Sequence, residues 1–166
     1  MSERTKPVLT GGCQCGAVRY ALYSAPNNAG ICHCRMCQKA VGGPFKAWAN
    51  VRVADFAFTR GRAATFRSSS AAERGFCARC GTPLSFAYLK RPDVIGVTIG
   101  SLDTPQAVAL RQVDGIESRL ANFQQAALEG VPARNTGVGG SPEDLSRIVS
   151  YQHPDHDTPP DWHPPA

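Results

Sequence analysis

The chain of 166 residues has no long apolar run. Its longest apolar stretch, VIGVTIG at 94–100, has the length of one strand, whereas a membrane-spanning helix needs about 20 apolar residues. The first ten residues, MSERTKPVLT, have no apolar core of the kind that a secretory signal carries. From these two absences we expect a cytoplasmic protein that does not bind membranes.

Acidic side chains are scarce in the first hundred residues, which hold 14 Lys and Arg against 4 Asp and Glu. Such a basic segment is one signature of nucleic-acid binding. However, the segment also holds all seven cysteines, and metal ligation would turn these into thiolates that offset much of the charge. It has no interleaved basic and aromatic run on which bases could stack. Nucleic acid is therefore not the expected partner, and a mildly positive surround suits a small anionic substrate.

The cysteine count is odd, so the cysteines cannot all be paired in disulfides within one chain. The seven fall into three clusters: Cys13 and Cys15; Cys32, Cys34 and Cys37; Cys77 and Cys80. Close spacing of this kind, without a secretion signal, is typical of metal binding or redox chemistry. We expect zinc as the cofactor, because thiolates at these spacings are common zinc ligands.

Short strands separated by glycine-containing turns account for most of the cysteine-bearing part. The residue patterns favour strands in five segments: 17–24, 45–58, 62–69, 84–89 and 94–102. In 45–58 the inward-pointing apolar positions nearly alternate: Phe45, Ala47, Ala49, Val51 and Val53. Many short strands joined by turns predict a mainly β, antiparallel fold. Beyond them, helical patterns predict helices at 141–151 and at 114–130, where one apolar stripe holds Ile116, Leu120, Phe123 and Ala127. The last segment, 153–166, has five prolines and three histidines and is not expected to form regular structure.

Two of the cysteine clusters have the form of tight metal-binding turns, GGCQCG at 11–16 and CARCG at 77–81. If these turns meet across a sheet, their four thiols can close one tetrahedral site. A second grouping would join Cys34 and Cys37 to the CARCG turn, as in a zinc ribbon. The 39 residues between those pairs exceed the usual separation of about 15–20. The spacing leaves both groupings open.

The stretch ICHCRMC at 31–37 lacks a fourth cysteine. Under the first grouping its three cysteines leave one coordination position open, which is typical of a catalytic zinc. The other interpretation is a structural site completed by a histidine: His33, His153 or His156. Three thiolates donate strongly to zinc, so the metal would favour a thiol as fourth ligand and hold it deprotonated. The cluster therefore predicts chemistry on an incoming thiol rather than hydrolysis.

Four segments together resemble the glutathione-dependent formaldehyde-activating enzyme family: GCQCGAVRY (12–20), CHCRMCQKAVGGPF (32–45), FTRG (58–61) and SSSAAERGFCARCGTPLSF (68–86). The resemblance covers about residues 11–102 and implies an Mss4-like zinc-binding β fold. It implies a structural zinc on Cys13, Cys15, Cys77 and Cys80, and a catalytic zinc on Cys32, Cys34 and Cys37. The activity it implies is addition of the glutathione thiol to formaldehyde, giving S-hydroxymethylglutathione, which is a carbon–sulfur lyase reaction in reverse.

The expected organisation has four parts: an N-terminal arm (1–10), a zinc-binding β domain (11–110), a helical extension packed on it (111–152) and a Pro/His-rich tail (153–166). His33 or a tail histidine is the candidate proton donor. Arg35, Lys39 and Lys46 are the candidate partners of glutathione carboxylates. The alternative to an enzyme is a non-catalytic zinc-binding module that interacts with nucleic acid or protein.

Overall fold

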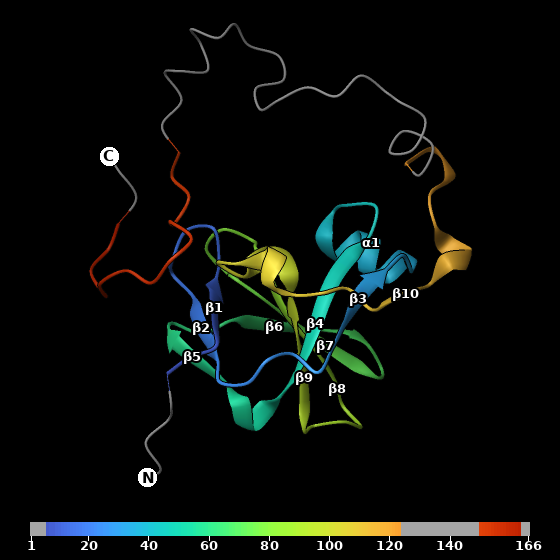
Figure 1. The fold of residues 1–166 in the computed structure, drawn as a ribbon. Coiled ribbons are helices and arrows are strands. Elements are labelled where there is room, and N and C mark those ends of the chain that lie inside the picture. The colour runs from blue at the N-terminus through green and yellow to red at the C-terminus, as the bar shows by residue number, and fades with distance from the viewer. Residues whose placement is uncertain (1–5, 124–149, 164–166) are drawn as a thin grey trace, which may run out of the picture.

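The computed structural model describes residues 6–123 and 150–163, which are built mainly of β-strands (Figure 1). The strands are β1 (Leu9–Gly12), β2 (Arg19–Leu22), β3 (Asn28–Cys32), β4 (Lys46–Arg52), β5 (Phe56–Arg60), β6 (Ala64–Ser69), β7 (Ala72–Phe76), β8 (Pro83–Tyr88), β9 (Val94–Thr98) and β10 (Gln112–Asp114). They form a three-stranded sheet in the order β1-β2-β5 and a seven-stranded sheet in the order β10-β3-β4-β9-β8-β7-β6. The mainly β fold predicted from the sequence is confirmed.

Helical segments in the described residues are short. The helix α1 covers Arg35–Val41, and four 3-10 helices follow: η1 (Val53–Asp55), η2 (Ile99–Ser101), η3 (Pro105–Ala107) and η4 (Ile116–Ser118). Residues 121–123 are also helical. No helix in this part of the chain is long and apolar enough to cross a membrane.

Strand β4 shows how the larger sheet separates a core face from a functional face. Ala49 and Val51 are 0 % and 1 % exposed and belong to the core, which side chains of β2, β4, β8 and β9 share. Successive side chains of a strand point to opposite faces. Lys46, Trp48 and Asn50 therefore face the other way, where they line a cavity.

Several of the predicted strands are present, but one is interrupted and other elements were not predicted. The expected strand 45–58 is interrupted by η1, so that β4 belongs to the larger sheet and β5 to the smaller one. Val53, predicted to point inward, is 44 % exposed in this 3-10 turn. The strands β1, β3, β7 and β10 and the helix α1 were not predicted.

Two of the expected segments contain strands that were not predicted. Strand β1 begins at Leu9, inside the expected N-terminal arm, because its backbone pairs with β2. The expected helix at 114–130 does not start at Asp114, since Gln112–Asp114 pairs in parallel with the free edge of β3. Ile116, expected on a buried helical stripe, is 63 % exposed. Residues 124–130 of that helix, and residues 141–149 of the expected helix at 141–151, lie outside the described residues.

Residues 153–163 have no helix or strand, as predicted, yet they are attached to the β body (Figure 1). Residues 150 and 151, expected to end the helix at 141–151, are not helical, so this end of the helix prediction is wrong. His153 is 4 % exposed, and its backbone N–H donates to the carbonyl of Gln14 at 2.7 Å. Arg60 donates to the carbonyls of Thr158 and Pro159 at 2.7 and 2.8 Å. The tail therefore lies against the turn that carries the first two cysteines.

Candidate metal centres and the adjoining pocket

Four cysteines from two distant turns come together in what we call the four-cysteine cluster: Cys13, Cys15, Cys77 and Cys80. The two turns are joined where the backbone N–H of Gln14 donates to the Thr82 hydroxyl at 3.0 Å. Gly81, at φ 78°, gives the second turn a left-handed conformation that other residues rarely adopt. All four thiols are free, and their ligand atoms lie within 4.8 Å of one another.

The sulfur separations in this cluster suit a tetrahedral metal site. The Sγ atoms of Cys13 and Cys15 are 3.6 Å apart, and those of Cys15 and Cys77 are 3.9 Å apart. Four sulfurs at about 2.3 Å from one zinc ion would be about 3.8 Å from each other. The structure thus favours the first of the two groupings that the sequence left open, and Cys34 and Cys37 do not join the CARCG turn.

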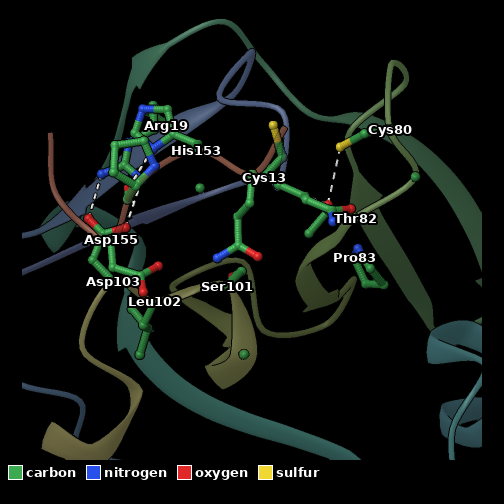
Figure 2. Close-up of a pocket in the computed structure, with 16 residues that line it drawn as sticks. Cys13, Arg19, Cys80, Thr82, Pro83, Ser101, Leu102, Asp103, His153 and Asp155 are labelled. Atoms are coloured by element: carbon green, nitrogen blue, oxygen red, sulfur yellow. Dashed lines mark hydrogen bonds and ion pairs between the residues drawn. The ribbon is translucent and has the colours of Figure 1, made fainter. Parts of the chain in front are cut away.

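The tail histidine lies beside this cluster without completing any ligand set. A cavity of about 430 Å³ is lined by Cys13, Cys80, Asp103 and His153, among others (Figure 2). The ring nitrogens of His153 are occupied, with Nδ1 2.7 Å from the Pro154 carbonyl and Nε2 2.9 Å from the Thr158 hydroxyl. Among the described residues, no histidine lies with either cysteine group as a further ligand. The structure therefore does not support the hypothesis that a histidine completes the site of Cys32, Cys34 and Cys37.

Beneath the tail, a buried ion pair ties the β body to the segment after β9. The Arg19 guanidinium, 3 % exposed, bonds the carboxylate of Asp103 and also reaches Asp157 of the tail at 2.7 Å. Burial opposes ionisation of Asp103, but the hydrogen bonds from Arg19 and Thr10 outweigh it and hold the pKa of Asp103 below its ordinary value. The pair therefore stays charged at neutral pH.

The remaining cysteines form the three-cysteine cluster: Cys32, Cys34 and Cys37. Cys32 ends β3, Cys34 caps α1, and Cys37 lies in its first turn. The backbone N–H of Cys37 donates to the Cys34 sulfur at 3.4 Å, which satisfies one of the free amides of the helix start. The three thiols lie within 4.8 Å of one another, so the strand-to-helix turn presents them as one group.

The thiols of each cluster do not ionise alike. Burial raises the pKa of Cys32 to about 12. Burial acts in the same direction on Cys34, but the backbone N–H of Cys37 and the neighbouring thiols outweigh it and lower the pKa of Cys34. In the other cluster, burial raises the pKa of Cys13 to about 12, whereas bonds to Thr82 outweigh burial and lower the pKa of Cys80 to about 6. A bound cation would ionise all thiols of a cluster together, so both donor sets fit a metal.

Two buried cations adjoin the three-cysteine cluster. Lys46 is 4 % exposed and lies opposite Cys32 in the β3–β4 register. Arg74 is 6 % exposed, and its Nη2 donates to the Cys37 sulfur at 3.5 Å. Burial, followed by the charge of Arg74, lowers the pKa of Lys46 to about 8, and the neighbouring Cys37 and Cys32 side chains act in the opposite direction.

Of the cations predicted from the sequence, only Lys46 is at the site. Arg35 and Lys39 are exposed on α1, and the Arg35 guanidinium donates to the Gln38 side chain. Arg74 was missed because the stretch AERGF gives no clear strand pattern, although an arginine in a short segment between two predicted strands is a signal in hindsight. Arg74 belongs to β7, and its side chain reaches Cys37 of α1.

A second cavity, of about 440 Å³, opens beside Cys32 and Cys37 and has the size of a small-molecule site. The rings of Trp48 and Phe86 form an apolar part of the cavity wall, and the Lys46 ammonium forms a charged part. No tail histidine lines this cavity, and neither does the other candidate proton donor, His33. It is buried against Phe45, with ring centroids 5.7 Å apart, and its Nδ1 has no hydrogen-bond partner.

Residues 8–113 match the family model described as glutathione-dependent formaldehyde-activating enzyme. An uncharacterized lyase of Schizosaccharomyces pombe is 33 % identical over 82 residues, which cover 49 % of this chain and 59 % of that protein. A putative glutathione-dependent formaldehyde-activating enzyme of Halomonas elongata is 30 % identical over 105 residues, covering 58 % of this chain and 67 % of that protein. A solved structure of a Rhodobacter sphaeroides protein is 26 % identical, has a TM-score of 0.46, and is matched over 55 % of this chain and 85 % of its own.

Proposed function

This chain belongs to the glutathione-dependent formaldehyde-activating enzyme family, and from that premise we propose that it is a zinc-dependent carbon–sulfur lyase-type enzyme. It adds a thiol, with glutathione as first candidate, to formaldehyde or another small aldehyde and forms an S-hydroxyalkyl adduct. The observation that carries this proposal is a cluster of three thiols beside a cavity of about 440 Å³. Three ligands and an adjoining cavity leave room for a fourth ligand that comes from the substrate.

We assign the metal ligands as two sets. The four-cysteine cluster holds a structural zinc, and its burial in the hydrophobic core supports that role. The three-cysteine cluster holds the catalytic zinc, which when bound keeps an incoming thiol deprotonated. Cys32, Cys34 and Cys37 therefore serve as zinc ligands and do not themselves attack the aldehyde.

The chain's own side chains then arrange the reactants. Trp48 and Phe86 exclude water from one wall of the cavity. Lys46 in the cavity wall and Arg74, bonded to the Cys37 sulfur, supply positive charge beside the site where the thiolate forms. The thiolate sulfur forms a bond to the aldehyde carbon, and the carbonyl π pair becomes an alkoxide. The alkoxide takes up one proton, which balances the proton lost from the thiol. The exposed rim residues Tyr88 and Arg91 leave the cavity open to water, from which that proton can come.

A nucleic-acid-binding module is the weaker candidate. Part of the positive charge that could attract phosphates is buried: Arg19 lies in an ion pair, and Lys46 and Arg74 lie beside thiols. Phosphate contacts need cations on the surface. The buried positions of Lys46 and Arg74, which have no carboxylate partner among the described residues, favour a small anionic ligand inside the protein.

Seven free thiols and a thiol substrate fit a reducing compartment. We therefore place the proposed activity in the cytoplasm.

Exchange NMR with ¹³C-formaldehyde and glutathione tests the proposed function. The zinc-loaded protein should raise the rate of interconversion between the free aldehyde and its thiol adduct above the uncatalysed rate. Cys37→Ser should return the rate to the uncatalysed value, whereas His156→Ala, an exposed change in the tail, should leave it unaltered. If the wild type carrying two zinc ions gives no acceleration with glutathione or a simpler thiol, the proposed activity is wrong.

A further inference from the structure

Lys46 and Arg74 are charged side chains in a place where charge is normally paired. Both are more than nine-tenths buried. Within residues 6–123 and 150–163, neither forms an ion pair with a carboxylate. The Nε atom of Arg74 also has no hydrogen-bond partner. Buried cations are tolerated in proteins when an anion compensates them. Asp114 and the exposed Arg91 also line the cavity beside Lys46, but their opposite charges offset each other. The compensating anion is therefore expected from the cysteine cluster and what binds there.

The fold fixes both cations above one aromatic ring. The Lys46 ammonium lies 5.2 Å, and the Arg74 guanidinium 4.9 Å, from the centroid of the Phe86 ring. The three residues come from β4, β7 and β8, which belong to the same rigid sheet. Cation–π contact stabilises each charge in this position. Both charges are therefore held beside the same ring before any ligand binds, with Lys46 on the cavity that Cys32 and Cys37 line and Arg74 on the Cys37 sulfur.

Their combined charge exceeds that of the metal cluster alone. A zinc ion with three thiolates carries one net negative charge, whereas Lys46 and Arg74 together carry two positive charges. Water as the fourth ligand would leave one buried positive charge in excess. A thiolate as the fourth ligand gives the cluster two negative charges and balances the pair.

We infer that Lys46 and Arg74 are positioning residues that select an anionic fourth ligand, so that the three-cysteine cluster captures a substrate thiol as its thiolate. Arg74 acts through Cys37, to whose sulfur it donates a hydrogen bond. Lys46 acts on the cavity side, since it lines the cavity together with Cys32 and Cys37. The inference rests on the proposed function, because it takes this cluster as the site where the thiol binds.

Cobalt substitution tests this selection without a measurement of activity. Zinc is kept in the four-cysteine cluster and Co²⁺ is placed in the three-cysteine cluster, whose thiolate-to-cobalt charge-transfer absorption reports each bound thiolate. The protein is titrated with 2-mercaptoethanol, which has no carboxylate, so that only the charge at the metal is probed. In the wild type, the absorption should rise by the contribution of one further thiolate.

Lys46→Met and Arg74→Met should each weaken 2-mercaptoethanol binding by about 10- to 100-fold, the usual range for residues that support metal ligands. The charge-preserving changes Lys46→Arg and Arg74→Lys should restore most of the affinity. Arg67→Met is the matched control, because Arg67 is a largely exposed cation of the same sheet. It should bind as the wild type does.

The outcomes separate this inference from the proposed function. If the wild type binds the thiol and both methionine variants bind it equally well, the inference is wrong and the proposed function stands. The same holds if the charge-preserving variants are as impaired as the methionine variants, since packing and not charge would then be responsible. If cobalt occupies three thiolates and the wild type gains no further absorption, the proposed function itself fails.

Discussion

The seven cysteines differ from one another in how deeply each is buried in the hydrophobic core. Cys13 and Cys77 are buried in the hydrophobic core, and Cys15 and Cys80 pack against it. The three-cysteine cluster is not part of that core, although Cys37 is buried. Ligand substitutions in the two clusters should therefore have different effects.

We expect Cys80→Ser to give insoluble or molten protein and Cys37→Ser to stay folded. Structural zinc contributes about 10–16 kcal/mol to small domains, which matches or exceeds a total stability of about 5–15 kcal/mol. Thermal melts and one-dimensional NMR spectra of the two variants provide the measurement. Collapse of Cys37→Ser to the same extent would make the three-cysteine cluster structural and remove the main support for an enzyme.

Asp103 makes a single-residue contribution to acid stability. Because its folded-state pKa lies below its ordinary value of 3.8, its contribution is present above about pH 4 and is lost as the pH falls through the lower folded value. Asp103→Asn should lower the unfolding free energy at pH 7 by about 3 kcal/mol, since it leaves Arg19 buried with only the exposed Asp157. Urea unfolding at pH 7 and between pH 5 and 3 measures both effects.

Loss of metal in acid lowers the unfolding free energy of the wild type and of Asp103→Asn alike. The difference between their unfolding free energies at each pH therefore isolates the contribution of Asp103. The difference should be largest at neutral pH and shrink below about pH 4. A constant difference down to pH 3 would show that the Asp103 carboxylate is not held ionised by Arg19.

Among the elements, the tail makes the contacts that are easiest to separate. His153 is buried against Trp162, with ring centroids 4.6 Å apart, and against the cysteine turn, whereas His156 in the same segment is exposed. His153→Ala should lower the unfolding free energy by about 2 kcal/mol, and His156→Ala should change it by less than about 0.5 kcal/mol. Urea unfolding of the two variants checks the stability difference.

The same pair of variants reports on the metal. His153→Ala should release zinc from the four-cysteine cluster to a chelator faster than wild type, because the cysteine turn loses the imidazole ring that packs on Gly16 and bonds the Thr158 hydroxyl. His156→Ala should release it at the wild-type rate. Equal release rates in all three proteins would show that the tail does not hold the cluster.

An element could be predicted from the sequence when the pattern of its own residues determines its structure. The alternating apolar residues of β4 identified its core face correctly, since Ala49 and Val51 are buried. The strand β10 could not be predicted, because it is held mainly by pairing with β3, about 80 residues earlier. The ligand grouping also stayed open in the sequence, since only the folded sheet decides which turns meet. Arg74 was missed for two reasons: the stretch AERGF has no clear strand pattern, and the contact with Cys37 forms only in the folded protein.

At the scale of the whole molecule, the two clusters should differ in how firmly they hold metal. We expect about two zinc ions per chain, with the ion of the three-cysteine cluster lost first under mild chelation, because three ligands hold zinc less firmly than a closed set of four. Elemental analysis before and after chelation measures this. A chain that takes up only one zinc ion even after refolding with excess metal would contradict it.

The contacts made beyond the family match have an evolutionary consequence. The match ends at residue 113, yet Gly115 lies so close to Cys34 that a β-carbon there would be 2.6 Å from its backbone nitrogen, and His153 covers the other cluster. Substitutions in these two segments can alter how each metal is held while every cysteine is inherited unchanged. Descendants of one ancestor could thus diverge in thiol preference or metal retention with an identical cysteine pattern. Lineages within the family would then be better separated by their C-terminal segments than by their ligands.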